Sequence, residues 1–272
     1  MTEALGAGWL IYLLFPLIGI VSGLLAGLFG IGGGLVIVPA LNLFFATQPL
    51  GIPSGARMHF AIGSSLAVIV FTAVSSLLAH NRRGAVLWPA VARLVPGIVI
   101  GGLLGAALAD AMGNRMLEAT FGILVVAIAL YMALGRPPRA ALPLPAWPGF
   151  FGAGTVIGAI SALAGIGGGV LTVPFLVWRT VALHTAVGTA AACTMPVALA
   201  GATGFVLTGM QAGMPVPFAT GYVYWPAVAG ISFASVLTAP LGARLAHSLP
   251  VAKLRRAFAL LLVLVGARML AG

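Results

Sequence analysis

Two glycine-rich motifs have the residue types and spacing best suited to binding chemistry. Gly-Ile-Gly-Gly-Gly occupies residues 30–34 and recurs at 165–169, and a proline follows each copy at the same distance. Each copy interrupts an apolar run, and glycine in a helix interior costs about 1 kcal/mol relative to alanine. A helix that restarts after such a break presents free N–H groups and a positive dipole end, which favour an anion. The predicted binding residues are Gly30, Gly32, Gly33, Gly34 and Pro39, with Gly165, Gly167, Gly168, Gly169 and Pro174 in the second copy.

The occurrence of two such breaks narrows the kind of site. In lipid, irregular backbone is tolerated only where it packs in protein or lines a cavity. Paired breaks at matching places in two halves of a chain are typical of a transporter substrate site near the middle of the membrane. The alternative is that the glycines only allow helices to pack closely, as small residues do in membranes.

Polar side chains at matched positions supply further candidates. Ser64 and Thr189 follow the matched residues His59 and His184 in two apolar segments. The hydroxyls could donate to the anion, or they could make ordinary hydrogen bonds within and between helices. The histidines are candidates for gating or proton transfer because histidine titrates near neutral pH, or they cap helix ends. Arg93 is a third candidate for gating, since an intramembrane charge is costly, but it could also extend to the membrane surface.

Composition places these residues in a membrane. Of 272 residues, 61% are hydrophobic and 6% are charged, whereas soluble domains carry about 25% charge. The long apolar runs do not alternate, which favours helical spans over a barrel. The net charge of +10 comes from arginines between apolar runs, so it indicates topology and not a nucleic-acid partner. We therefore predict an all-α, multi-pass membrane protein whose partners are the lipid bilayer and a small anionic substrate. Homo-oligomer formation is left open.

Ten apolar segments must position the motifs, five in each half. The first repeat is expected at 1–135, a proline-rich cytoplasmic linker at 136–148 and the second repeat at 149–272. Blocks resembling one another in the same order support the duplication, such as Gly-x-Val-x-Trp-Pro at 84–89 and 221–226. The expected segments are 9–29, 35–45, 60–79, 87–109 and 117–134, then 150–164, 170–178, 184–207, 225–246 and 254–270.

The charges of equivalent loops differ between the halves. The turn at 81–84 is basic, whereas its equivalent, the predicted loop 208–224, has no charge. The region after the fourth segment shows the reverse pattern, being basic only in the second half. If basic loops face the cytoplasm, equivalent loops lie on opposite sides and the repeats are inverted. Inversion requires an odd number of crossings per half, giving ten crossings or six with re-entrant hairpins. Eight crossings would make the repeats parallel.

The sequence lacks the residues that several other kinds of chemistry would require. We expect no Asp or Glu embedded in the membrane, so a sodium site or a carboxylate proton relay has no obvious residue, and no phosphate-binding Gly-x4-Gly-Lys-Ser/Thr motif is present. No group of His, Cys, Asp and Glu has metal-ligand spacing, so we expect no metal, no cofactor and no catalytic residues. Export of a monovalent anion needs no coupling ion, because the membrane potential supplies about 2.3 kcal/mol per 100 mV.

The duplicated Gly-x-Gly-Gly-Gly-x4-Pro motif, each copy preceding a segment with histidine and Gly-Ser or Gly-Thr, resembles the TauE/SafE family of sulfite exporter-like permeases. The resemblance runs from about Ile18 to Leu270. It implies an inner-membrane permease for sulfite, thiosulfate, an organosulfonate or a related sulfur-containing anion, acting mostly outward. Family members are commonly drawn with eight spans, which differs from an odd number per half. The alternative functions are an anion channel and a membrane-embedded enzyme, for which Cys193 would be the only thiol.

Overall fold

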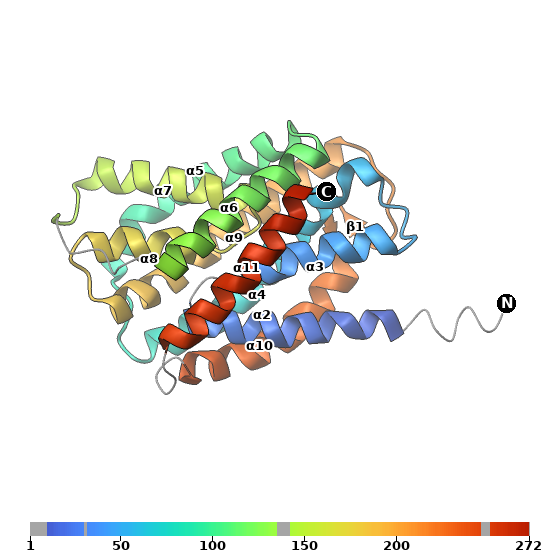
Figure 1. Ribbon diagram of the computed structural model, residues 1–272. Helices are drawn as coiled ribbons and strands as arrows, with labels where there is room; N and C mark the ends of the chain where they lie inside the picture. The colour runs from blue at the N-terminus through green and yellow to red at the C-terminus, as the bar shows by residue number, and fades with distance from the viewer. Residues whose placement is uncertain (1–9, 30–31, 135–141, 246–250, 272) are drawn as a thin grey trace.

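The computed structural model describes residues 10–29, 32–134, 142–245 and 251–271. Within these ranges the chain forms an elongated bundle of ten α-helices (Figure 1). The helices of the first half are α2 (Leu14–Phe29), α3 (Gly34–Thr47), α4 (Arg57–Asn81), α5 (Trp88–Asp110) and α6 (Asn114–Leu134). Those of the second half are α7 (Trp147–Leu163), α8 (Gly169–Trp178), α9 (Leu183–Gln211), α10 (Trp225–Leu245) and α11 (Val251–Ala271). The 3-10 turns η1 (Leu10–Leu13) and η2 (Ser54–Ala56) precede α2 and α4.

Every predicted apolar segment contains one helix, so the apolar runs located the helices correctly. Five helices of the described chain, namely α4, α5, α6, α9 and α10, are long and apolar enough to cross a membrane. The helices α3 and α8, which follow the glycine motifs, are much shorter, with 14 and 10 residues. The protein is therefore a multi-pass helical membrane protein in which two short helices start inside the bundle.

The predicted loop 208–224 requires a correction. Helix α9 continues to Gln211, and the strands β1 (Ala219–Thr220) and β2 (Val223–Tyr224) then pair antiparallel. The Tyr222 N–H donates to the Phe205 carbonyl at 3.2 Å, which anchors this hairpin on α9. Strands of two residues are too short to leave an alternating pattern, so the expectation of an all-α fold missed them.

Two helix pairs that join the halves form the outer walls of the bundle. Helix α5 packs along α7, and α10 packs along α2. Glycines bring the backbones together, because a Cβ atom on Gly154 would collide with the Leu94 carbonyl oxygen. A Cβ atom on Gly19 would collide in the same way with the carbonyl oxygen of Ile231. Gly19 and Gly154 are equivalent when the two glycine motifs are aligned, so the two walls are built alike.

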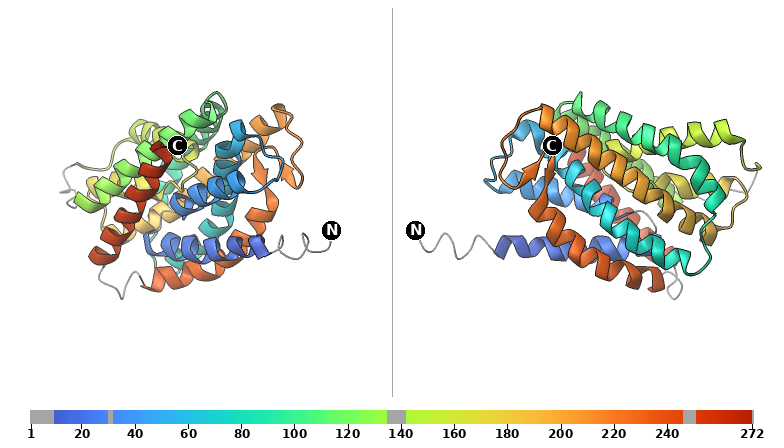
Figure 2. Two further views of the ribbon diagram at one scale, coloured as in Figure 1. Left: turned by 45° about the vertical axis from the view of Figure 1, so that its right-hand side comes forward. Right: turned by 180° about the vertical axis from the view of Figure 1, so that it is seen from behind.

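Two pairs of helices, each with one member from either half of the chain, pack antiparallel. Gly63 in α4 lies against Phe205 in α9, whereas Leu66, one turn later, lies against Gly201, one turn earlier. The same reversal relates α6 to α11, which cross one face of the bundle together (Figures 1 and 2). In both pairs the two helices therefore run in opposite directions.

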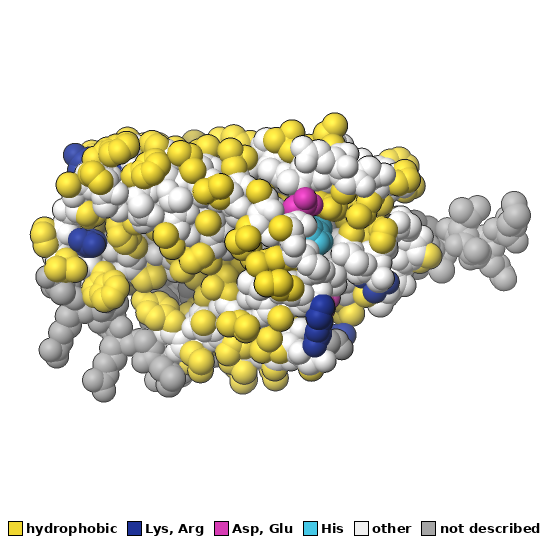
Figure 3. All heavy atoms as spheres, turned by 90° about the horizontal axis from the view of Figure 1, so that it is seen from above, with side chains coloured by type: hydrophobic (Ala, Val, Ile, Leu, Met, Phe, Trp, Pro, Cys, Tyr) yellow, Lys and Arg dark blue, Asp and Glu magenta, His cyan; other side chains and the backbone are white. Residues whose placement is uncertain are grey.

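The outer surface suits a lipid environment. Figure 3 shows a broad apolar face, with charged side chains near its two ends. Exposed leucines such as Leu104 in α5 and Leu264 in α11 contribute to such surface. The interior is also largely apolar, and the ring contacts of Phe45, Phe60 and Tyr222 hold one end of the main core together. Polar interior residues are therefore rare, which makes their positions informative.

Candidate functional site

The two glycine motifs meet in the interior of the bundle. A Cβ atom on Gly32 would lie 3.0 Å from the Gly167 Cα atom, and one on Gly34 would collide with the Gly165 carbonyl oxygen. Only glycine allows the two segments to approach this closely. Gly30 and Ile31 fall outside the described residues, so the contact is defined from Gly32 onward. The remaining motif glycines are buried.

The backbone of each motif starts a short helix. Gly32 and Gly33 have φ angles of +75° and +79°, and Gly165 has +64°, a conformation that L-residues with side chains rarely adopt. The N–H groups of Val36 and Ile37 donate to the Gly33 carbonyl, which begins α3. The corresponding bonds to the Gly168 carbonyl begin α8. The first N–H groups of both helices have no carbonyl partner within their own helix.

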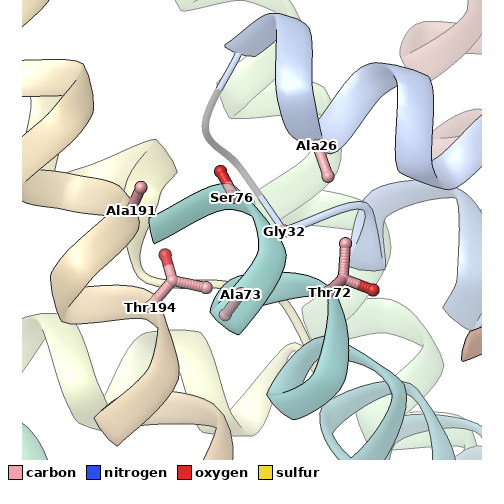
Figure 4. A pocket seen from close by; sticks show the side chains of 7 residues that line it. All are labelled: Ala26, Gly32, Thr72, Ala73, Ser76, Ala191 and Thr194. Carbon is pink, nitrogen blue, oxygen red and sulfur yellow. The ribbon is translucent and has the colours of Figure 1, made fainter. Parts of the chain in front are cut away.

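A small cavity lies beside this contact (Figure 4). Its volume is about 10 Å³, roughly the space for one water molecule. It lies between α2, α4, α9 and the first glycine motif, and none of its described lining residues is charged. They are Ala26, Gly32, Thr72, Ala73, Ser76, Ala191 and Thr194.

The hydroxyls of the cavity differ in their hydrogen bonding. Thr194 Oγ1 donates to the Ala190 carbonyl at 2.9 Å. Thr72 Oγ1 lies 2.6 Å from Ser235 Oγ and 3.2 Å from the Val68 carbonyl oxygen. Ser76 Oγ is buried and has no hydrogen-bond partner among the residues that the structure describes. An unsatisfied buried hydroxyl is unfavourable, so Ser76 identifies this cavity as a place where a polar ligand would be stabilised.

The matched hydroxyls predicted to bind the anion accept hydrogen bonds from backbone N–H groups. Ser64 Oγ accepts the Tyr224 N–H, and Thr189 Oγ1 accepts the Leu87 N–H, both at 2.9 Å. Tyr224 and Leu87 occupy equivalent positions, each directly before a Trp-Pro pair that begins a helix of the other half. Each hydroxyl therefore fixes the start of α10 or α5. Neither residue lines the cavity.

Pro39 and Pro174 lie inside the helices that follow the motifs. Both are partly buried, within α3 and α8 respectively. Pro39 lines a separate, larger groove on the outer side of α3. Neither proline is part of the lining of the small cavity.

The candidates for gating lie away from the cavity. His59 is 4% exposed, and its Nε2 atom lies 3.1 Å from the Ala109 carbonyl oxygen. Its ring packs on Tyr222, with 5.0 Å between the ring centroids. Its equivalent, His184, is exposed at the start of α9. Arg93 is also exposed, and its guanidinium lies 5.8 Å from the centroid of the Phe150 ring.

Tyr222 connects His59 to an acidic residue at the end of the bundle. Its hydroxyl donates to Asp110 Oδ1 at 3.1 Å. Burial, together with the charge and hydrogen bond of Asp110, raises the pKa of Tyr222 to about 12. The tyrosine therefore stays protonated at neutral pH and keeps the hairpin tied to α5.

Sequence reasoning missed some of these residues. Thr72 and Ser76 are four residues apart and so share one helix face, which was a usable signal. Their equivalents in the second half are Val197 and Gly201, so a search for matched polar residues passes over them. Glu118, near the start of α6, is partly buried and accepts hydrogen bonds from Asn42 and Asn114.

Comparison with known proteins shows which family the chain belongs to. The family described as "Sulfite exporter TauE/SafE" matches residues 15–269. The chain belongs to the TauE/SafE family. It is 36% identical to a probable membrane transporter protein of Haemophilus influenzae, over 94% of this chain and 97% of that protein. It is 27% identical to one of Methanocaldococcus jannaschii, over 84% of this chain and 83% of that protein.

A third relative matches a shorter part of the chain. It is a probable membrane transporter protein of Bacillus subtilis, 30% identical over 47% of this chain and 46% of that protein. No solved structure shows a significant match. Together with the helical architecture, the family identifies this TauE/SafE protein as a membrane transporter, and the names of its relatives are those of transporters, not enzymes.

The glycine motifs differ in backbone conformation, and this difference predicts different sensitivities to alanine. In Gly33→Ala the side chain is placed at a φ of +79°, and its Cβ lies 2.8 Å from the Ser22 carbonyl oxygen. The conformation alone costs about 1–2 kcal/mol. In Gly168→Ala the φ angle is ordinary, and the nearest atom is the movable Val197 Cγ2 at 2.9 Å.

We expect Gly33→Ala to lower the melting temperature of the purified protein by several degrees and Gly168→Ala to lower it by clearly less. Thermal unfolding in detergent, followed by intrinsic fluorescence, measures both variants against the unmodified chain. Equal shifts would show that the left-handed conformation at Gly33 does not constrain the motif.

Proposed function

We propose that this TauE/SafE transporter carries a small sulfur-containing anion, such as sulfite, thiosulfate or an organosulfonate, across the inner membrane and exports it. The observation that carries the proposal is the contact of the two glycine motifs beside a cavity with an unpaired Ser76 hydroxyl. The sulfur chemistry of the substrate rests on the family description.

Uncharged donors suit such a substrate. The candidate donors are the Ser76 hydroxyl and the first N–H groups of the helix that starts at Gly34. The N-terminal end of a helix also carries a partial positive charge. A sulfur oxyanion has several oxygens that can accept from these donors at once. Because the donors carry no full charge, the anion would be bound reversibly, as transport requires.

We infer that the two halves are inverted repeats, related by a two-fold axis in the membrane plane. The antiparallel pairing of α4 with α9 and of α6 with α11 supports this. So do the equivalent bonds from Ser64 to Tyr224 and from Thr189 to Leu87. In this arrangement the short helices α3 and α8 enter the site from opposite sides. Their alternate movement would expose the anion first to the cytoplasm and then to the outside.

The size of the cavity favours a transporter over an anion channel. At about 10 Å³ it admits a water-sized particle, so a larger oxyanion can enter only if surrounding helices move. Export of a monovalent anion follows the membrane potential, which supplies about 2.3 kcal/mol per 100 mV. In this mechanism neither a coupling ion nor a cofactor is needed, and the proton-linked role of His59 and His184 and the gating role of Arg93 stay untested predictions.

Ser76 gives a direct test of the site. Ser76→Ala removes the unpaired hydroxyl, so we expect the apparent affinity for sulfite to fall about tenfold. The melting temperature of the purified protein is measured at increasing sulfite concentration. The apparent affinity is the sulfite concentration that gives half of the full rise in melting temperature. Ser75→Ala is the matched control, because the Ser75 hydroxyl donates to the Val236 carbonyl and is not part of the cavity lining. Equal affinities in the two variants would exclude Ser76 as a ligand.

Single cysteines test the inversion of the repeats. In a Cys193→Ala background, Arg83→Cys and Ala212→Cys place thiols in two equivalent, exposed connections. We expect a membrane-impermeant maleimide applied to intact cells to label Ala212→Cys only, and Arg83→Cys to react only after the cells are opened. Labelling of both from the same side would exclude inverted repeats.

A further inference from the structure

A second, larger hollow lies on the outer side of α3. It is a groove of about 490 Å³ between α3, α6 and α11, separate from the small cavity. Most of its wall is apolar, as in Leu35, Leu43 and Leu261, and several lining residues are exposed. In a membrane protein a groove of this kind opens toward lipid.

The groove has a polar end formed by helix termini. Arg57 begins α4, and Arg268 lies in the last turn of α11. Glu118 and Asn42 complete this end of the lining. Arg57 Nε and Asn42 Oδ1 are buried, and neither has a hydrogen-bond partner in the described part of the chain. The groove therefore has unused polar atoms at one end only.

The two arginines give the polar end of the groove a net positive charge. The Glu118 carboxylate accepts from Asn42 at 3.3 Å and from Asn114 at 3.0 Å, and it pairs with Arg115 at 3.7 Å. Its charge is thus already compensated. Arg57 and Arg268 remain to attract an anionic group.

The length of the apolar wall matches one leaflet of a bilayer. Along α3 the lining extends from Leu35 to Ala46. At 1.5 Å per residue, this stretch of helix is about 16 Å long. Half of a hydrocarbon core of about 30 Å is roughly the same length. With Arg57 and Arg268 at the level of the head groups, an acyl chain would reach from the helix ends to the first turn of α3.

We propose that this groove binds one anionic phospholipid, with its phosphate at Arg57 and Arg268 and an acyl chain along α3 and α11. The unpaired Asn42 Oδ1 accepts a head-group hydroxyl. The site belongs to the first half only, because the positions equivalent to Arg57, Asn42 and Arg268 are Ala182, Val177 and Tyr131. A bound lipid would rest on α3, the helix that starts at the glycine contact. The proposal does not depend on which anion is transported.

Native mass spectrometry of the delipidated full chain in detergent tests the proposal, with phosphatidylglycerol and phosphatidylcholine as probes. We expect one phosphatidylglycerol to bind at least tenfold more tightly than phosphatidylcholine. The double variant Arg57→Gln and Arg268→Gln should lose this preference. The matched control, Arg82→Gln and Arg83→Gln, removes two exposed arginines of the turn after α4 and should keep it.

A head-group control and single variants complete the test. Glycerol phosphate carries the head-group charge without acyl chains, and we expect no binding of it at the same concentrations. If the double variant does not fold, each single variant is measured, with an expected loss of about threefold. Equal binding of the two lipids to the unmodified protein, equal loss in the control, or tight binding of glycerol phosphate would each overturn the proposal.

Discussion

The contact between two glycine segments is the constraint on which the rest of the structure depends. Gly34 lies against the carbonyl group of Gly165, and Gly32 lies against Gly167. No side chain fits between these backbones, so the two motifs fix each other and set the starting points of α3 and α8. Because both helices start inside the bundle, their N-terminal groups lie in a largely apolar interior, where polar groups need partners. The small cavity beside Gly32 is a consequence of that arrangement.

Backbone-to-backbone packing also holds the surrounding scaffold. The walls formed by α5 with α7 and by α2 with α10 rely on glycines that face carbonyl oxygens. Small residues are suited to membrane helices because lipid provides no hydrophobic driving force for helix association, and close van der Waals contact must supply it. The hydroxyls of Ser64 and Thr189 add fixed points at equivalent places.

Much of this architecture follows from the sequence, and the exceptions have physical causes. Long apolar runs separated by arginine and proline located every helix, and the costly glycine clusters located the breaks. Symmetry in the sequence predicts Ser64 and Thr189 as ligands, and in the structure each of them accepts a backbone N–H at the start of a helix. The cavity hydroxyls Thr72 and Ser76 have no matched partners. The contact of Glu118 with Asn42 could not be predicted, because these residues are 76 positions apart and come close only in the fold.

The central claim is that the site between the glycine motifs carries a sulfur anion across the membrane. Flux into and out of proteoliposomes with purified protein tests it most directly, with sulfite, thiosulfate, sulfate, sulfoacetate and chloride compared under an imposed potential. If the protein is such a transporter, we expect saturable movement of a sulfur anion that follows the potential and shows counterflow, with chloride excluded. The absence of flux for every sulfur anion, or unsaturable flux that includes chloride, would contradict it.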